Sequence, residues 1–119
     1  MYLLGYIMDD KITIKATDGF ERWLKALKNI QARAKIVARI KSAEKGNFGD
    51  CKPVGEGISK MRIHCHSGYR IYFMKHELTV YILLVGGNKA SQQQDIIRAK
   101  ELARQIRVGN YEHGDNPGF

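Results

Sequence analysis

Four side chains able to act on a phosphodiester occur in two closely spaced pairs. Arg62 and His64 are separated by one residue, and so are Arg70 and Tyr72. Because successive side chains of a β-strand point to opposite faces, each pair shares a face if its segment is a strand. Guanidinium groups bind anions such as phosphate, and imidazole and phenol groups donate or accept protons. The two pairs therefore suit chemistry on an anionic group.

Each of the four residues has a predicted role and a simpler alternative. Arg62 and Arg70 suit phosphate binding because the guanidinium fork matches phosphate oxygens and stays charged. His64, or a lysine with a depressed pKa, is a candidate acid or base, and Tyr72 can stack on a base or donate a proton. The alternatives are a cross-strand contact between Arg62 and Tyr72, a solvated His64, and a tyrosine that only covers the sheet.

Further basic residues are candidates for RNA binding. Lys52 lies in a Gly-rich segment and Lys89 follows the last predicted strand, so both can reach over the same face. A basic helical surface would in turn lie against RNA phosphates. The candidate RNA-binding residues are Lys52, Lys60, Lys89, Arg33 and Arg39.

The positive charge of the chain is concentrated in its middle. The chain has 119 residues and a formal net charge of +8. Residues 18–75 contain thirteen Lys and Arg against five Asp and Glu, whereas residues 1–17 and 76–119 are each neutral overall. A basic excess confined to about half the chain favours a polyanionic partner over charge spread for solubility. RNA, DNA, an acidic protein and a membrane surface all fit this pattern.

Neither the cysteines nor the histidines predict a metal site. Cys51 and Cys65 form no C-x-x-C motif and are expected to be free thiols in a reducing cytosol. His64 and His66 flank Cys65, but neighbours on a strand point to opposite faces and cannot converge on one metal. We therefore expect no metal and no other cofactor.

No segment has the length of a membrane span. Met1–Met8 is apolar, but it lacks a basic start and a cleavage site and stops at two aspartates, so it is too short for a signal peptide or a membrane helix. It is either an extra strand or an extension upstream of an initiator at Met8. We expect a soluble, cytoplasmic protein.

Local patterns predict the elements that position the candidate residues. Ile12–Thr17 alternates as a half-buried strand. Two basic helices follow, one after a capping pair formed by Asp18 and Glu21, the other over about Gln31–Lys45. The segment Gly46–Gly57 contains four glycines and a proline and is predicted to be a loop. A last helix is predicted to start at a Ser91 cap. The strands between the loop and this helix are predicted at Ser59–Cys65, Tyr69–Lys75 and Thr79–Val85.

The register of these strands decides which side chains meet. A three-residue loop ending in Gly would place Arg62 opposite Tyr72 and His64 opposite Arg70. In the next hairpin, with a turn at His76 and Glu77, Tyr72 is expected opposite Tyr81, and Phe73 opposite Val80. One face of the sheet is then apolar and covered by helices, and the other is basic, aromatic and exposed.

The element order is β-α-α-β-β-β-α. It predicts an α+β fold with a small, largely antiparallel sheet and helices packed on one face. We expect one domain over residues 1–119, with a core over about 12–107 and a loose tail at 109–119.

Five segments together make the chain resemble the RelE/ParE toxin superfamily. They are Phe20–Leu27 (FERWLKAL), Ala32–Arg39, Gly46–Gly55 (GNFGDCKPVG), Lys60–Phe73 (KMRIHCHSGYRIYF) and Leu84–Asp95 (LVGGNKASQQQD). More narrowly, the chain is similar to the phage-derived, HigB-like branch called the addiction module killer protein. The resemblance covers about Ile12 to Ile106, in the same order and spacing, and implies a RelE-like fold.

The resemblance implies a toxin of a type II toxin-antitoxin pair. RelE-like members cleave mRNA in the ribosomal A site without a metal, using Lys, Arg, Tyr and sometimes His side chains of the exposed sheet face. ParE-like relatives share the fold but poison DNA gyrase, so the fold does not choose between the activities. The first hypothesis is a ribosome-dependent mRNA endonuclease, and the alternatives are a gyrase inhibitor without catalysis and a non-toxic RNA-binding protein. The implied partners are a cognate antitoxin, commonly a helix-turn-helix protein, the ribosome and mRNA, with no membrane and with DNA contacted only through the antitoxin complex.

Overall fold

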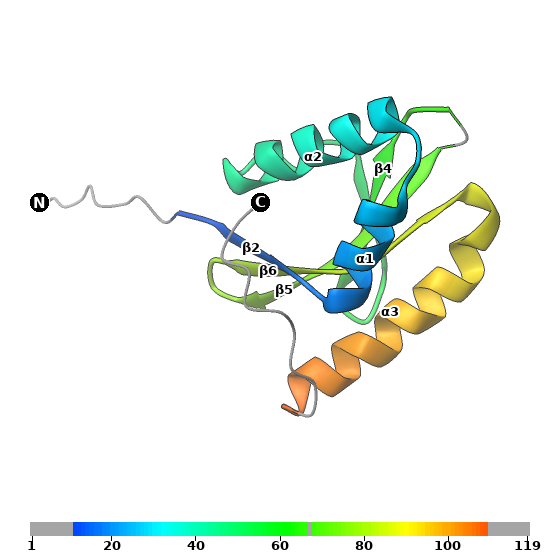
Figure 1. Cartoon of the computed structure of the whole chain (residues 1–119). Helices are drawn as coiled ribbons and strands as arrows, with labels where there is room; N and C mark the ends of the chain where they lie inside the picture. Colours follow the sequence, from blue (N-terminus) through cyan, green and yellow to red (C-terminus); the bar gives the residue numbers. More distant parts are fainter. Residues whose placement is uncertain (1–10, 67, 110–119) are drawn as a thin grey trace, which may run out of the picture.

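The computed structural model describes residues 11–66 and 68–109 and shows a mixed α+β fold (Figure 1). Its strands are β2 (Thr13–Ala16), β3 (Cys51–Gly55), β4 (Ile58–Ile63), β5 (Tyr69–Glu77) and β6 (Val80–Asn88). Its helices are α1 (Asp18–Ala26), α2 (Ile30–Glu44) and α3 (Gln92–Arg107), with a short 3-10 turn, η1 (Lys89–Ser91), before α3. The α+β class is confirmed, and the predicted order is found with one strand added. The predictions for Met1–Met8 and for residues 110–119 fall outside the described residues.

The strands form one sheet in the order β2-β6-β5-β4-β3. β2 runs parallel to β6, and every other pair of neighbours is antiparallel. Two of the candidate strands, β4 and β5, therefore lie inside the sheet, and β3 forms one of its edges.

The Gly-rich segment was predicted to be a loop over its whole length, but its second half forms β3. Pro53 is tolerated there because an edge strand has one row of N–H groups without a partner strand. The turn from β3 to β4 consists of Glu56 and Gly57, which have φ of 55° and 77°. Two successive positive φ values are typical of the two-residue hairpin turn whose twist matches that of the sheet.

The hairpin of β4 and β5 pairs two residues away from the predicted register. Arg62 lies opposite Arg70 and Lys60 lies opposite Tyr72, so the predicted partners of Arg62 and His64 were wrong. The reason is that β4 ends at Ile63, which lengthens the connection to positions 64–68. Because side-chain orientation repeats every two residues, this shift leaves every side chain on its predicted face.

The second hairpin also differs from the prediction. Tyr72 lies opposite Val85 and Phe73 lies opposite Leu83, whereas the prediction paired them with Tyr81 and Val80. Tyr81 packs against Phe48 and Phe73, on the face of the sheet opposite to Tyr72, so the prediction that both tyrosines share a face was wrong. Both strands are longer than predicted and turn at positions 78–79, and the register shifts at an irregularity between Tyr72 and Phe73. Alternation of apolar residues cannot reveal such a shift, because one extra residue in a strand changes the partners without changing the composition.

Helices α1 and α2 pack on one face of the sheet (Figure 1). The buried residues of this first core are Ile14, Ala16, Phe20, Leu24, Ile36, Ile40, Ala43, Met61, Ile63, Ile71, Phe73 and Leu83. Phe48, which precedes β3, stacks on Phe73 with ring centroids 5.3 Å apart. This contact anchors the Gly-rich segment to the first core.

The helix caps differ in detail from the predicted ones. Thr17, not Asp18, caps α1, since its Oγ1 accepts a hydrogen bond from the N–H of Phe20 at 3.1 Å and donates one to a carbonyl of β6 at 2.8 Å. Asn88 caps η1 through its side-chain oxygen, and Ser91 makes no capping hydrogen bond. Both helix starts are therefore tied to β6.

Helix α3 covers part of the opposite face, which the sequence analysis left exposed. The second core consists of Ile58, Tyr72, Met74, Ile82, Leu84, Ala99, Leu102, Ala103 and Ile106. The prediction that helices cover only one face was therefore wrong. The apolar side chains that this face carries would otherwise be exposed to water, and the apolar stripe of α3 buries them.

Two smaller predictions concern membranes and cysteines. Within residues 11–66 and 68–109, no helix is both long enough and apolar enough to cross a membrane. Cys51 and Cys65 are free thiols, as predicted. Burial raises the pKa of Cys51, whose Sγ donates a hydrogen bond to the carbonyl of Phe48 at 3.2 Å.

Candidate nucleic-acid interface

Basic side chains of three neighbouring strands gather beside the start of α3. Arg62 of β4 and Arg70 of β5 are cross-strand partners, and Lys60, two residues before Arg62, shares their face. Lys52 of β3 is the cross-strand partner of Lys60. Lys52 is exposed and the other three are half-buried. We call Lys52, Lys60, Arg62 and Arg70 the basic cluster.

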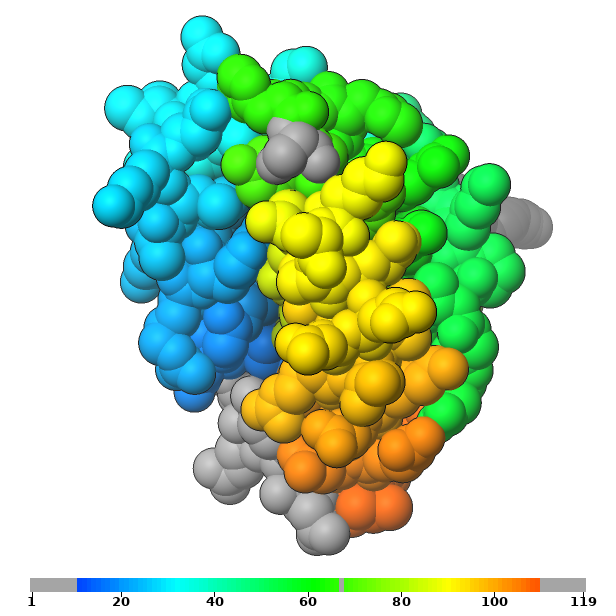
Figure 2. All heavy atoms as spheres, turned by 90° about the vertical axis from the view of Figure 1, so that its right-hand side faces the viewer, coloured from blue at the N-terminus to red at the C-terminus, as the bar shows by residue number. Residues whose placement is uncertain are grey.

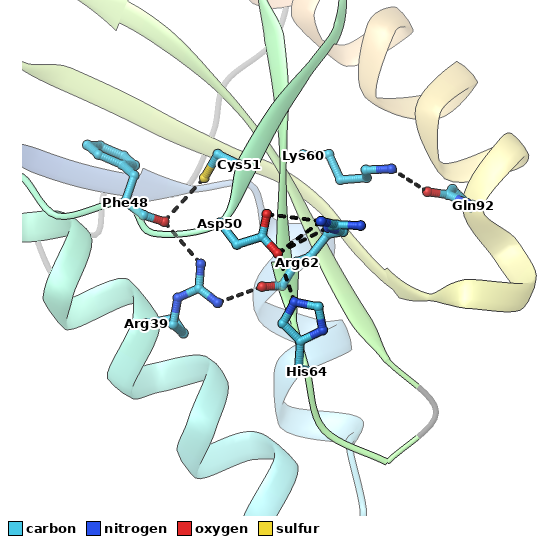
Figure 3. Close-up of polar contacts among 8 residues, drawn as sticks. All are labelled: Arg39, Phe48, Asp50, Cys51, Lys60, Arg62, His64 and Gln92. Atoms are coloured by element: carbon cyan, nitrogen blue, oxygen red, sulfur yellow. Dashed lines mark hydrogen bonds and ion pairs between the residues drawn. The ribbon is translucent and has the colours of Figure 1, made fainter.

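The carboxylate of Asp50 pairs with the basic cluster. Asp50, which precedes β3, accepts hydrogen bonds from Nε and Nη2 of Arg62, each at 3.2 Å (Figure 3). Its Oδ2 also lies 2.8 Å from Nε2 of His64. The hydrogen bonds from His64 and from Arg62 hold the pKa of Asp50 below its usual value. Asp50 was not among the residues predicted from the sequence, although its position directly after Gly49 in a basic stretch was a signal that pointed to it.

His64 follows β4 instead of belonging to it, and its side chain is 73% exposed. Its backbone carbonyl accepts a hydrogen bond from Nζ of Lys35 on α2 at 3.4 Å. The imidazole therefore lies at the border between the basic cluster and α2. It is accessible to a substrate and oriented by Asp50, as a group that transfers protons must be.

Lys60 has an environment that suits proton transfer. Its Nζ donates a hydrogen bond to Oε1 of Gln92, the first residue of α3, at 2.8 Å (Figure 3). Burial, and then the positive charges of Arg70 and Arg62, lower the pKa of Lys60. A lower pKa makes an ammonium group a better acid at neutral pH. We predicted that Lys60 binds RNA and that a lysine with a depressed pKa is a candidate acid or base; the lowered pKa of Lys60 makes it a candidate for that second role as well.

Tyr72 is not part of the accessible surface. Its side chain is 0% exposed and lies in the second core under α3. Burial, and then the negative charge of Asp95, raise the pKa of Tyr72 to about 12. A phenol in this position can neither stack on an RNA base nor reach a leaving oxygen. This burial does not fit the predicted catalytic role, and it fits the simpler alternative, a tyrosine that covers the sheet.

Arg70 lies where the basic cluster meets the second core. Its Nε and the hydroxyl of Tyr72 are both buried without a hydrogen-bond partner among the described residues. Gly87 is the cross-strand partner of Arg70 on β6, and a Cβ there would collide with the carboxylate of Asp95. Asp95 in turn accepts a hydrogen bond from Oγ of Ser91 at 2.6 Å. The glycine thus lets the start of α3 lie directly against the strand next to Arg70.

Arg39 is engaged inside the protein, although the prediction had it facing solvent. It donates from Nη1 to the carbonyl of Arg62 and from Nη2 to the carbonyl of Phe48, the latter at 3.0 Å (Figure 3). These bonds tie α2 to β4 and to the Gly-rich segment. The structural role of Arg39 is therefore to hold the segment that carries Asp50 in place.

Lys89 and Arg33 occupy different surfaces. Lys89 is exposed in η1 and lines a cleft of about 400 Å³ with His64, Cys65, His66, Gly68 and Arg70. Arg33 is half-buried on α2 and lines a separate shallow groove with Ile30, Ala34, Val37 and Ala38. Lys89 is therefore brought together with the candidate residues of the sheet, and Arg33 is not.

A further groove of about 420 Å³ lies between α1 and α3. The two helices lie next to each other in Figure 2, in blue and in yellow to orange. The charged residues that line this groove are Asp18, Arg22 and Arg98, and the groove shares no residue with the basic cluster. Because its charges are mixed, the basic cluster is the better candidate for binding a polyanion.

Comparison with known proteins gives one close relative. The chain is 48% identical over 95 residues to a protein of Haemophilus influenzae described as an uncharacterized protein, and the match covers 80% of this chain and 96% of that protein. No family model matches the chain, and no solved structure matches it.

Proposed function

We propose that this protein is a ribosome-dependent mRNA endonuclease and the toxin of a type II toxin-antitoxin pair. The chain belongs to the same family as the Haemophilus influenzae protein. The observation that carries this proposal is the meeting of Lys60, Arg62 and Arg70 beside an exposed His64. The order of the elements and the largely antiparallel sheet support a RelE-like arrangement as part of the same proposal.

The proposed reaction uses the 2'-hydroxyl of the RNA as the nucleophile and needs no metal. A base takes the hydroxyl proton, the 2'-oxygen bonds to phosphorus, the bond from phosphorus to the 5'-oxygen breaks, and an acid gives that oxygen a proton. Arg62 and Arg70 stabilise the added negative charge of the phosphorane, since both guanidinium groups stay charged. His64 and Lys60 are the two groups that exchange protons. Tyr72 has no part in this scheme because it is buried.

The proposed partners follow from the positions of the remaining positive charges. On α2, Lys35 and Lys41 are exposed and Arg33 is half-buried, so this helix offers a surface to ribosomal RNA phosphates. Lys52, at the β3 end of the basic cluster, and Lys89, in the cleft beside Arg70, would hold the mRNA on either side of Arg62 and Arg70. A cognate antitoxin would neutralise the toxin by covering the cluster. The proposal places the protein in the cytoplasm, where its ribosomal target is.

The test is cleavage of mRNA in a translating extract, with the 5' ends mapped along the message. Wild-type protein should produce cuts in phase with codons. Arg70→Ala should reduce the cleavage rate by about a hundredfold, the usual loss when one group that stabilises transition-state charge is removed. Arg98→Ala, which removes the same charge from an exposed position of α3, is the matched control and should cleave normally. Circular dichroism should show that both variants are folded.

The same experiment can refute the proposal. A folded Arg70→Ala variant that cleaves like wild type would exclude the assigned role of the cluster. Absence of codon-phased cuts together with inhibition of DNA supercoiling would instead support a gyrase inhibitor. Absence of both activities, with no growth arrest on expression, would indicate a non-toxic RNA-binding protein.

A further inference from the structure

We infer that Asp50 is a positioning residue for His64. It holds the imidazole in the form that carries its proton on Nε2, so that His64 exchanges the substrate proton at Nδ1. This inference rests on the proposed function for its chemistry, but the orientation of the ring can be tested without any cleavage assay. It concerns a residue that the sequence analysis did not select.

The geometry gives Asp50 two partners at once. Its Oδ2 lies 2.8 Å from Nε2 of His64, and its two oxygens accept the two hydrogen bonds from Arg62 at 3.2 Å (Figure 3). One carboxylate therefore sets the distance between the imidazole and the guanidinium. A phosphate bound by Arg62 would in consequence lie next to the exposed ring of His64.

The backbone fixes the position of this carboxylate. The carbonyl of Asp50 accepts a hydrogen bond from the N–H of Arg62 at 3.0 Å. Arg39 holds the carbonyl of Phe48 two residues earlier. Gly49 between them has φ of +69°, and a Cβ there would lie 2.7 Å from Nη2 of Arg39. The glycine therefore allows the close approach of Arg39 that fixes the segment in front of Asp50.

The chemistry of the pair selects one ring nitrogen. An ionised carboxylate only accepts hydrogen bonds, and Asp50 is ionised at neutral pH because its pKa lies below the usual value. The nitrogen that faces it must then carry a proton, which leaves Nδ1 of the neutral ring with a free lone pair. The other charged and titratable groups around the ring are Lys35 and Arg39 of α2, Arg62 of β4, and Cys65, His66, Arg70 and Lys89 of the neighbouring cleft. None of these neighbours is a carboxylate, so Asp50 is the anionic acceptor in this group.

The proton balance of the step follows. The 2'-hydroxyl gives its proton to Nδ1 of neutral His64, and the resulting imidazolium is paired with the carboxylate of Asp50. The 2'-oxygen forms its bond to phosphorus, and the bond to the 5'-oxygen breaks. The leaving oxygen takes a proton from the ammonium group of Lys60. Asp50 itself neither gains nor loses a proton.

The direct test is the tautomer of His64, read from the nitrogen chemical shifts of its ring by NMR at about pH 8.5, above the usual titration range of imidazole. Wild-type protein should show Nε2–H. In Asp50→Asn the amide NH₂ can donate to Nε2, so the population should move toward Nδ1–H. Glu56→Gln is the matched control, because Glu56 also pairs with an arginine, Arg104, at 2.7 Å, and it makes no contact with His64. It should leave the tautomer of His64 unchanged.

Cleavage supplies the second readout. Asp50→Asn should lower kcat by about tenfold to a hundredfold, no more than the lower end of acid-base contributions because the imidazole itself remains, and move the rising limb of the pH profile. Asp50→Glu keeps the carboxylate and should recover part of the loss. A role limited to folding would change neither the pH profile nor the tautomer of the folded protein.

The outcomes separate this inference from the proposed function. Wild-type His64 protonated at Nδ1 would overturn the inference, and this measurement needs no variant to fold. An unchanged pH profile in a folded Asp50→Asn variant would overturn it as well. Absence of RNA cleavage by wild-type protein, with the ring in the Nε2–H form, would refute the proposed function while leaving the Asp50–His64 pairing established.

Discussion

Replacing Tyr72 by phenylalanine should stabilise the protein. The hydroxyl of Tyr72 is buried and has no hydrogen-bond partner among the described residues, whereas the ring packs in the second core. A buried polar group without a partner costs about 1–3 kcal/mol relative to water. Phenylalanine removes this cost and keeps the ring contacts. Because a small void replaces the oxygen, we expect a net gain near the lower end, roughly 1 kcal/mol in the free energy of unfolding.

The assay is urea unfolding followed by circular dichroism, with the thermal midpoint as a second measure. A gain of this size should raise Tm by about 4 °C in a domain of this length. Tyr81→Phe is the matched control, because Tyr81 is half-buried against Phe48 in the first core and should change stability little. Tyr72→Ala, by contrast, should cost about 3–5 kcal/mol because it empties part of the second core.

The result also bears on catalysis, since the structure removes Tyr72 from the reactive surface. Tyr72→Phe should cleave mRNA at the rate of wild-type protein. A loss of stability above roughly 1 kcal/mol would mean that the hydroxyl has a partner, and this would refute the reasoning. A stable variant that no longer cleaves would restore Tyr72 to the catalytic residues.

Three further predictions follow from contacts near the candidate site. Gly86→Ala should lower the free energy of unfolding by about 1–3 kcal/mol in urea titrations, because its Cβ would overlap the ring of Trp23. Arg39→Ala should cost about 1–3 kcal/mol in the same assay because the carbonyls of Arg62 and Phe48 each lose a charged donor. Lys41→Ala, on the exposed side of the same helix, should be neutral. The pKa of the Asp50 carboxyl is lower in the folded state than its usual 3.8, so its pairing stabilises the protein above that pH and is lost as the pH falls through the folded value. Tm measured against pH should therefore show Asp50→Asn below wild type near neutrality and equal to it in strong acid; a constant difference down to the lowest pH would contradict this.

Long apolar periodicities were predicted correctly because they depend on local geometry. The strand around Ile14 alternates between buried and half-buried residues as predicted, and the helical stripe that contains Phe20 and Leu24 is buried. Each of these patterns repeats with the period of its own element, so it can be recognised without knowledge of the partner. The faces of Arg62 and Arg70 were predicted for the same reason.

The candidate site was predicted only in part, because its members are assembled by long-range contacts. Arg62, Arg70 and Lys60 do meet, but the partners of Arg62 are Arg70 and Asp50, which no local pattern indicates. Tyr72 has the alternation of an exposed strand residue and is nevertheless buried, because α3 folds back over that half of the sheet.

The sequence by itself determined where the charge is concentrated, which segments alternate or repeat with helical spacing, and which side chains of β4 and β5 share a face. These properties depend on the order of residues within one segment. Only the tertiary structure decided that β3 forms an edge of the sheet, that α3 buries Tyr72, and that Asp50 joins Arg62 to His64. Such contacts depend on the length of a turn or the packing of a distant helix, and a change of two residues in one connection alters every cross-strand pair while the local pattern stays the same.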